Sequence, residues 1–176
     1  MSAGAAGKEA VAPVAAPPTG RSLLSSAALV ALERLAERYP TREALLLPAL
    51  WRVQEEHGWI SPEAMQYVAE LLGVSPVRVY SVVSFYHMFH ERPPGKYNIQ
   101  VCHTLSCSLL GAERILAHLA RKLGIGADEI TPDGRFMIQR VECLGACEHA
   151  PVCQINDQFV FDLTPEKLDA RLEALP

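Results

Sequence analysis

The stretch V-E-C-L-G-A-C-E-H-A-P, residues 141–151, places two cysteines four positions apart around a glycine. Cys102 and Cys107 form a second close pair in V-C-H-T-L-S-C. An alternating apolar segment that predicts a strand leads into each pair, at residues 97–102 and at residues 136–141. We therefore expect loops at two strand ends to bring four thiols to one side of a sheet.

Four thiolates gathered by two loops can hold a soft metal centre. The first pair has four residues between its cysteines and the second has three, and 35 residues separate Cys107 from Cys143. Cysteine pairs at a structural zinc are most often two residues apart and wrap one ion. A [2Fe–2S] cluster has two irons that each need two thiolates, so wider pairs suit it better. The spacing favours the cluster and leaves a zinc-stabilised interaction protein as the alternative from another class.

Small residues surround both pairs. Gly145 and Ala146 lie inside the second pair, and Ser106 and Ser108 flank Cys107. Short side chains allow backbone amides to approach cluster sulfurs and donate hydrogen bonds, which raise the reduction potential. The alternative interpretation is that these residues only permit tight turns.

The fifth cysteine and two nearby histidines are not expected to be ligands. Cys153 follows Val152 in a predicted strand, where a buried apolar thiol is the expected role. His103 and His149 would have to replace two cysteines in a Rieske centre, and nothing in the sequence requires that. A thioredoxin-like oxidoreductase would carry Cys-x-x-Cys after its first strand, which the first pair does not match.

Composition and charge exclude several classes of protein. The 176 residues are 49% hydrophobic, enough for a packed core, and the net charge is -4 without a Lys/Arg-rich run. Neither nucleic acid nor an anionic membrane is therefore an expected partner. The longest apolar run, residues 44–51, is far shorter than the roughly 18 to 20 residues of a spanning helix. The N-terminus lacks the apolar core of a secretory signal, so we expect an intracellular protein.

The sequence divides into three parts. Residues 1–22 are rich in Ala, Pro and Gly and predict a flexible tail. Residues 23–92 contain four helical patterns, three of them starting at a serine, and predict a small helical bundle. Pro48 lies inside the second pattern, residues 41–58, where we expect a kink or a break. The E-R-P-P-G stretch, residues 91–95, predicts a linker.

Residues 93–176 predict a second domain. Strands at residues 97–102 and 136–141 flank a helix at about 109–123, and a hairpin at residues 152–161 precedes a last helix. This order is typical of a thioredoxin-like layer of sheet and helices. The predicted fold class is α+β, with the N-terminal helical bundle followed by a thioredoxin-like α/β domain.

The sequence shows no complete active site. Gly124 and Gly126 begin like a dinucleotide loop, but they follow a helix and Glu129 occupies the place of the third glycine. Neither a Ser-His-Asp nor a Cys-His arrangement is evident, so the chain is expected to carry electrons without transforming a substrate alone. Five aromatic residues are expected in the core or at an interface with a larger partner: Trp51, Trp59, Phe85, Tyr86 and Phe89.

Six segments together resemble a known family. They are Q-E-E-H-G-W-I-S (54–61), V-Y-S-V-V-S-F-Y-H-M-F (79–89), P-G-K-Y-N-I-Q-V-C (94–102), D-G-R-F (133–136), V-E-C-L-G-A-C-E-H-A-P (141–151) and Q-I-N-D (154–157). In this order they resemble the small, E-type thioredoxin-like [2Fe–2S] subunit of the NADH dehydrogenase module of respiratory complex I, an NADH-quinone oxidoreductase. The likeness leaves only the Ala/Pro-rich tail outside.

The resemblance implies a thioredoxin-like [2Fe–2S] ferredoxin domain with Cys102, Cys107, Cys143 and Cys147 as cluster ligands and no catalytic residue. It also implies docking onto a larger flavoprotein subunit that binds FMN and NADH, with this cluster near the flavin and off the main electron path. Cys153 departs from the commonest pattern of the family and puts no ligand in doubt.

The resemblance further implies a place in the respiratory chain. Such a subunit lies with other subunits in the peripheral arm of complex I, on the cytoplasmic side of a bacterial inner membrane and without direct membrane contact. Closely similar subunits serve NAD-reducing hydrogenases and NAD-dependent formate dehydrogenases. The diaphorase module of such an enzyme is therefore the alternative host.

Overall fold

The computed structural model describes residues 22–176, which divide into two compact units between Pro93 and Pro94. The predicted tail lies outside the described residues except for Ser22. The Ser22 hydroxyl donates to the Leu24 carbonyl at 2.6 Å and lies 3.1 Å from the Tyr67 hydroxyl, so this residue belongs to the first unit. Within residues 22–176, none of the helices combines the length and the hydropathy of a membrane-spanning segment.

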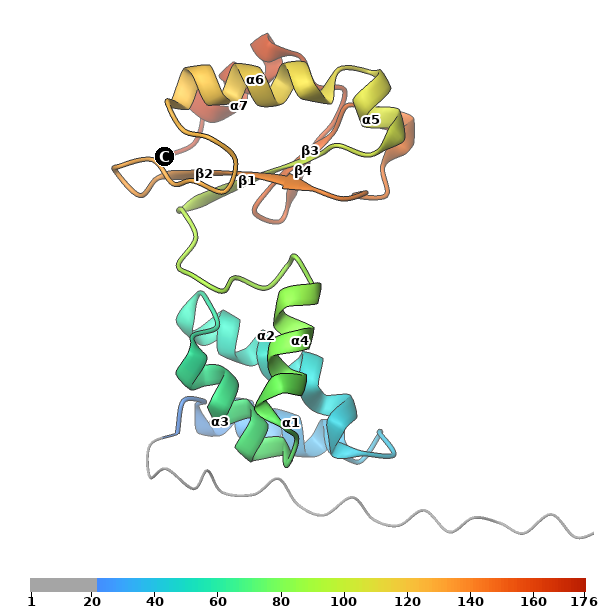
Figure 1. The fold of residues 1–176 in the computed structure, drawn as a ribbon, viewed down its shortest axis with the longest axis vertical. Helices are drawn as coiled ribbons and strands as arrows, with labels where there is room; N and C mark the ends of the chain where they lie inside the picture. The colour runs from blue at the N-terminus through green and yellow to red at the C-terminus, as the bar shows by residue number, and fades with distance from the viewer. Residues whose placement is uncertain (1–21) are drawn as a thin grey trace, which may run out of the picture. The chain divides into compact units, whose positions relative to one another are not determined.

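The first unit is helical (Figure 1). Its elements are α1 (Ser26–Ala36), η1 (Arg42–Leu45), α2 (Leu46–His57), α3 (Pro62–Leu72) and α4 (Pro76–Phe85). The hydroxyls of Ser25, Ser61 and Ser75 accept the amides at the starts of α1, α3 and α4 and satisfy donors that have no partner in the helix. Gly58 and Gly73 end α2 and α3 at φ 80° and 68°, in the left-handed conformation that favours glycine.

The second helical pattern is divided, but not at its proline. The 3₁₀ helix η1 ends at Leu45, and α2 starts at Leu46. Pro48 is the third residue of α2, in the first turn, where its missing amide hydrogen costs no intrahelical hydrogen bond. The break expected around Pro48 therefore occurs just before it, and the helix continues through the proline.

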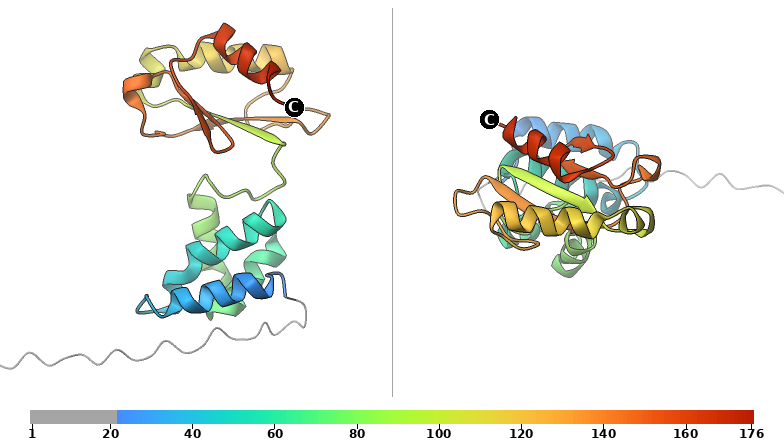
Figure 2. Two further views of the ribbon diagram at one scale, coloured as in Figure 1. Left: turned by 180° about the vertical axis from the view of Figure 1, so that it is seen from behind. Right: turned by 90° about the horizontal axis from the view of Figure 1, so that it is seen from above.

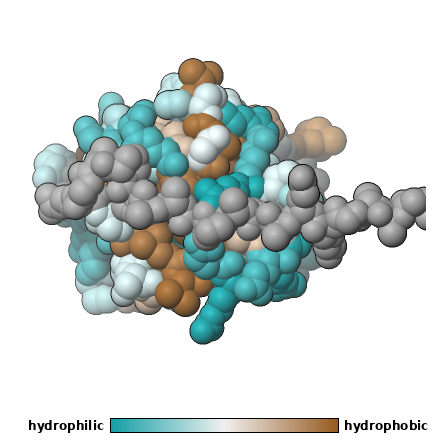
Figure 3. Space-filling model, turned by 90° about the horizontal axis from the view of Figure 1, so that it is seen from below, coloured by the Kyte–Doolittle hydropathy of each residue, from teal (hydrophilic) through white to brown (hydrophobic). Residues whose placement is uncertain are grey.

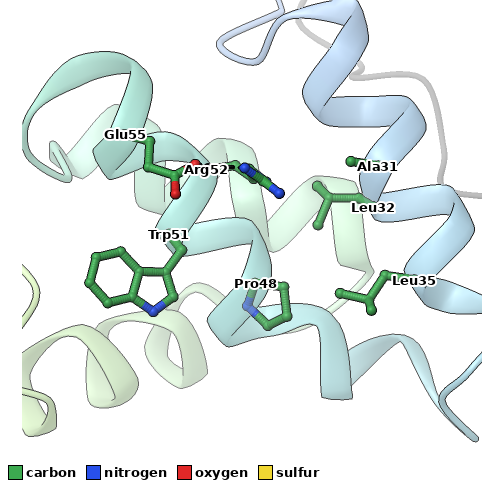
Figure 4. A pocket seen from close by; sticks show the side chains of 7 residues that line it. All are labelled: Ala31, Leu32, Leu35, Pro48, Trp51, Arg52 and Glu55. Atoms are coloured by element: carbon green, nitrogen blue, oxygen red, sulfur yellow. Dashed lines mark hydrogen bonds and ion pairs between the residues drawn. The ribbon is translucent and has the colours of Figure 1, made fainter.

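The aromatic residues of the first unit divide between core and surface. Phe89 is buried, whereas Phe85 is 78% exposed. Trp51 is 41% exposed, with its ring centroid 5.5 Å from that of Phe89 in an edge-on contact. Trp51 also borders an open hollow of about 460 Å³ between α1 and α2 (Figure 4). Figure 3 shows one face of the molecule, on which apolar residues are exposed among polar ones.

The second unit is a mixed sheet with helices on one face (Figures 1 and 2). Its elements are β1 (Tyr97–Cys102), α5 (Leu105–Leu109), α6 (Ala112–Leu123), β2 (Phe136–Val141), η2 (Cys147–His149), β3 (Cys153–Ile155), β4 (Gln158–Val160) and α7 (Pro165–Glu173). The strand order is β2-β1-β3-β4, with β1 parallel to β2 and the other neighbours antiparallel. Ile99 and Val101 of β1 are buried in one core with Leu119 of α6 and Leu168 of α7.

The helix predicted over residues 109–123 begins at Ala112 as α6, and Leu109 ends a separate short helix, α5. Gly111 separates α5 from α6 because its φ of 103° is outside the helical range. Leu109 and Leu110, on either side of the end of α5, are 77% and 61% exposed. Their apolar surface is available to another molecule.

Gln54 connects α2 to the segment that follows α4. Its side chain is 9% exposed, donates to the Met88 carbonyl at 2.8 Å and accepts the His90 amide at 2.7 Å. Gln54→Met removes both hydrogen bonds and leaves the Met88 carbonyl and the His90 amide without this partner. We therefore expect the free energy of unfolding, measured by urea denaturation, to fall by about 2 kcal/mol. The control Gln66→Met removes an exposed bond to Glu70 and should cost less than about 0.5 kcal/mol. Equal losses in the two variants would contradict this role.

Candidate metal centre

The parallel pairing of β1 and β2 brings the two cysteine pairs to the same end of the sheet. Cys102, the last residue of β1, is in register with Val141, the last residue of β2. Cys107 lies in α5, which follows β1 directly. Cys143 lies two residues beyond β2, and Cys147 begins η2. The cysteines were expected in two loops, whereas the structure places one in a strand, one in each of two short helices and one in a loop.

Burial and neighbouring thiols raise the pKa of two of the four cysteines. Burial, a hydrogen bond with Cys102 and the charges of Cys102 and Cys147 together raise the pKa of Cys107 to about 11. A hydrogen bond with Cys143 and the charge of that residue raise the pKa of Cys147. The four cysteines thus lie at one end of the sheet as two pairs, one at and after the end of β1 and one after the end of β2.

The pairs differ in exposure. Cys102 and Cys107, here called the inner pair, are buried, whereas Cys143 and Cys147, the outer pair, are exposed. All of them are free thiols. A centre held by the four would thus have one side inside the domain and the other at its surface.

Several polar groups are directed at the sulfurs. The Gly145 amide donates to Cys143 Sγ at 3.4 Å, and the φ of Gly145 is 76°. The Thr104 hydroxyl lies 3.2 Å from Cys102 Sγ. Burial alone would raise the pKa of Cys102, but hydrogen bonds from the Thr104 hydroxyl and from the amides of Thr104 and Leu144 outweigh burial and lower it. These donors stabilise thiolates, the form of cysteine that binds metal.

This donor set fits a [2Fe–2S] cluster better than a single ion. A structural zinc needs four donors around one ion, whereas each iron of a [2Fe–2S] cluster takes two protein thiolates. Two interacting pairs, with amides and hydroxyls directed at their sulfurs, match the second requirement.

The other residues considered from the sequence have different roles. Cys153 is fully buried in the core of the second unit, and burial raises its pKa to about 12. His103 Nε2 lies 3.3 Å from a Glu142 carboxylate oxygen. The His149 ring lies near that of Phe161, with ring centroids 4.8 Å apart and the ring planes tilted by 44°.

Sequence reasoning did not identify Thr104 or the Leu144 amide as part of this site. Thr104 immediately precedes α5, a short helix that the sequence analysis did not predict. A threonine before L-S-C-S-L, with Gly111 closing the segment, could have indicated a separate capped turn. No local pattern marks the Leu144 amide, because Leu144 follows β2 whereas the sulfur that it approaches belongs to Cys102 at the end of β1.

The sheet has the strand order β2-β1-β3-β4, carries helices on one face and has four thiols at one end. This combination is typical of a thioredoxin-like ferredoxin. The family model described as thioredoxin-like [2Fe–2S] ferredoxin matches residues 32–176. The chain belongs to this family.

Two curated relatives are similar over most of their length. NADH-quinone oxidoreductase subunit 2 of Thermus thermophilus is 48% identical over 147 residues, covering 82% of this chain and 81% of the relative. An E-type NADH-quinone oxidoreductase subunit of Rhizobium meliloti is 46% identical over 143 residues, covering 81% of this chain and 85% of the relative. The sequence-based assignment to this family of subunits is thereby confirmed.

A solved structure is also similar. It is an NAD⁺-reducing [NiFe]-hydrogenase in the air-oxidized state, with a TM-score of 0.63 and 25% identity. The match covers 73% of this chain but only 22% of the hydrogenase chain. This chain therefore corresponds to a minor part of that protein.

Cysteine variants test the assignment of the ligands. Cys102→Ser and Cys143→Ser each remove one thiolate from a pair, so we expect loss or alteration of the cluster in the visible absorption and EPR spectra. Cys153→Ser changes a buried thiol outside the group and should leave both spectra unchanged. An unaltered cluster in Cys143→Ser would contradict the ligand set.

Proposed function

We propose that the chain is an electron-transfer subunit that holds one [2Fe–2S] cluster on Cys102, Cys107, Cys143 and Cys147 in the NADH-oxidising module of an NADH-quinone oxidoreductase. The observation that carries the proposal is the placement of four free thiols at one end of the sheet, one pair at the end of β1 and the other just after β2. The names of the Thermus and Rhizobium relatives support the choice of host.

The residues of this chain would bind and shield the cluster, which supplies a one-electron carrier when it is bound. The inner pair excludes water on one side because Cys102 and Cys107 are buried. The exposed outer pair allows the redox group of a partner to approach on the other side. Amide and hydroxyl donors offset the negative charge that accompanies reduction.

The proposed partner is a larger protein that binds FMN and NADH. The exposed apolar side chains of Leu105 and Leu109, on the same helix as Cys107, support contact with a protein at this end of the domain. As part of this proposal, the complete active site is formed with that partner and the module lies on the cytoplasmic side of a bacterial inner membrane. The likeness to the NAD⁺-reducing hydrogenase favours a diaphorase component as the second candidate.

Metal analysis and EPR of anaerobically purified protein test the cofactor. We expect iron and sulfide at two each per chain, as the [2Fe–2S] formula requires, with no signal when oxidised and one spin-half signal after dithionite. Zinc without iron, in protein kept from air and supplied with iron during growth, would favour the zinc-stabilised alternative.

The Leu109→Glu substitution tests the proposed contact with the flavoprotein. A charge in an apolar interface is costly, so we expect at least a tenfold loss of association with the purified FMN-binding partner in a pull-down titration. The cluster spectrum should not change. Ala170→Glu adds the same charge at an exposed position on α7 and should bind normally. Undiminished binding of Leu109→Glu would exclude this surface as the contact.

A further inference from the structure

Thr104 occupies a helix-capping position but does not act as a cap. The side chains of Ser25, Ser61, Ser75 and Thr164 each accept a hydrogen bond from the amide three residues later, at the starts of α1, α3, α4 and α7. Thr104 has the same extended backbone before α5, with φ -76° and ψ 175°, yet its side chain makes no capping hydrogen bond. Its hydroxyl is directed elsewhere.

The alternative partner of this hydroxyl is the sulfur of Cys102. Thr104 Oγ1 lies 3.2 Å from Cys102 Sγ. In the free protein either atom could donate this hydrogen bond. A cysteine that binds iron is a thiolate without a proton, so only the threonine can then be the donor.

We infer that Thr104 is a positioning residue that acts through Cys102 and raises the reduction potential of the centre. Reduction adds one electron and one negative charge, and a hydrogen bond donated to a ligand sulfur stabilises the more negative state. Cys102 belongs to the buried inner pair, where water cannot replace a lost donor. The inference rests on the proposed cluster and concerns its potential, not its presence.

Potentiometric EPR titration of the full chain tests this role. Thr104→Val has nearly the same shape as threonine but lacks the hydroxyl, so the ratio of reduced to oxidised centre at a fixed potential should fall about tenfold. That change corresponds to about 59 mV for one electron. Thr104→Ser keeps the hydroxyl and should restore the ratio. Ser108→Ala removes an exposed hydroxyl from the same helix and should leave the ratio unchanged.

A second measurement compares the wild-type protein with the variants and distinguishes failure of this inference from failure of the proposed function. Proton ENDOR of the reduced centre should detect an exchangeable proton that remains in Thr104→Ser and is lost in Thr104→Val or Thr104→Ala. An unchanged potential with a lower melting temperature in Thr104→Val would overturn the inference, because the hydroxyl would then be only structural. Wild-type protein that binds zinc and no iron would instead refute the proposed function on which the inference rests.

Discussion

The parallel pairing of β1 with β2 is the constraint on which the site depends. Parallel strands end at the same edge of a sheet, so Cys102 and Val141 lie side by side although the chain between them forms two helices. The hydrogen bond from the His103 amide to the Val141 carbonyl, at 3.1 Å, extends the pairing beyond Cys102. The two segments that carry the remaining cysteines therefore leave the sheet at the same place.

The inner pair of thiols is buried and the outer pair is exposed. Within the proposed function, this difference suits a one-electron centre that exchanges electrons with a partner protein. Burial of the inner pair makes each donated hydrogen bond matter more, because water is not available as a substitute. Within the proposed function, exposure of the outer pair leaves a short path to the redox group of the partner. Small residues near the cysteines were expected either to permit tight turns or to let amides reach the sulfurs. Gly145 does both, since its left-handed conformation forms the turn and directs its amide to Cys143.

Each unit also exposes apolar surface that its own core does not use. Phe85 and part of Trp51 are at the surface of the helical unit, and Leu105 and Leu109 are at the surface of the second unit. Concentrated apolar exposure of this kind marks contact sites in proteins that function within assemblies. Within the proposed function, α5 combines a ligand on its buried side with a contact surface on its exposed side.

Several features follow from sequence alone. The strands at residues 97–102 and 136–141 have the bounds expected from their patterns, and three helices of the first unit begin at a serine as predicted. The spacing of the cysteines also favoured a [2Fe–2S] cluster over a structural zinc. These features depend on neighbouring residues, and local periodicity and conformational preference record them directly.

Tertiary structure decided the remainder. The division at Gly111, the outward orientation of Leu109 and the approach of Thr104 to Cys102 were not predicted. In a single sequence, Thr104 is one more potential helix cap, like Thr164. The path of the chain after β1 brings the hydroxyl to the sulfur, and that path is set by pairing with a strand more than thirty residues away. The sequence alone determined which thiols and donors the protein has, whereas the sheet decided which of them meet.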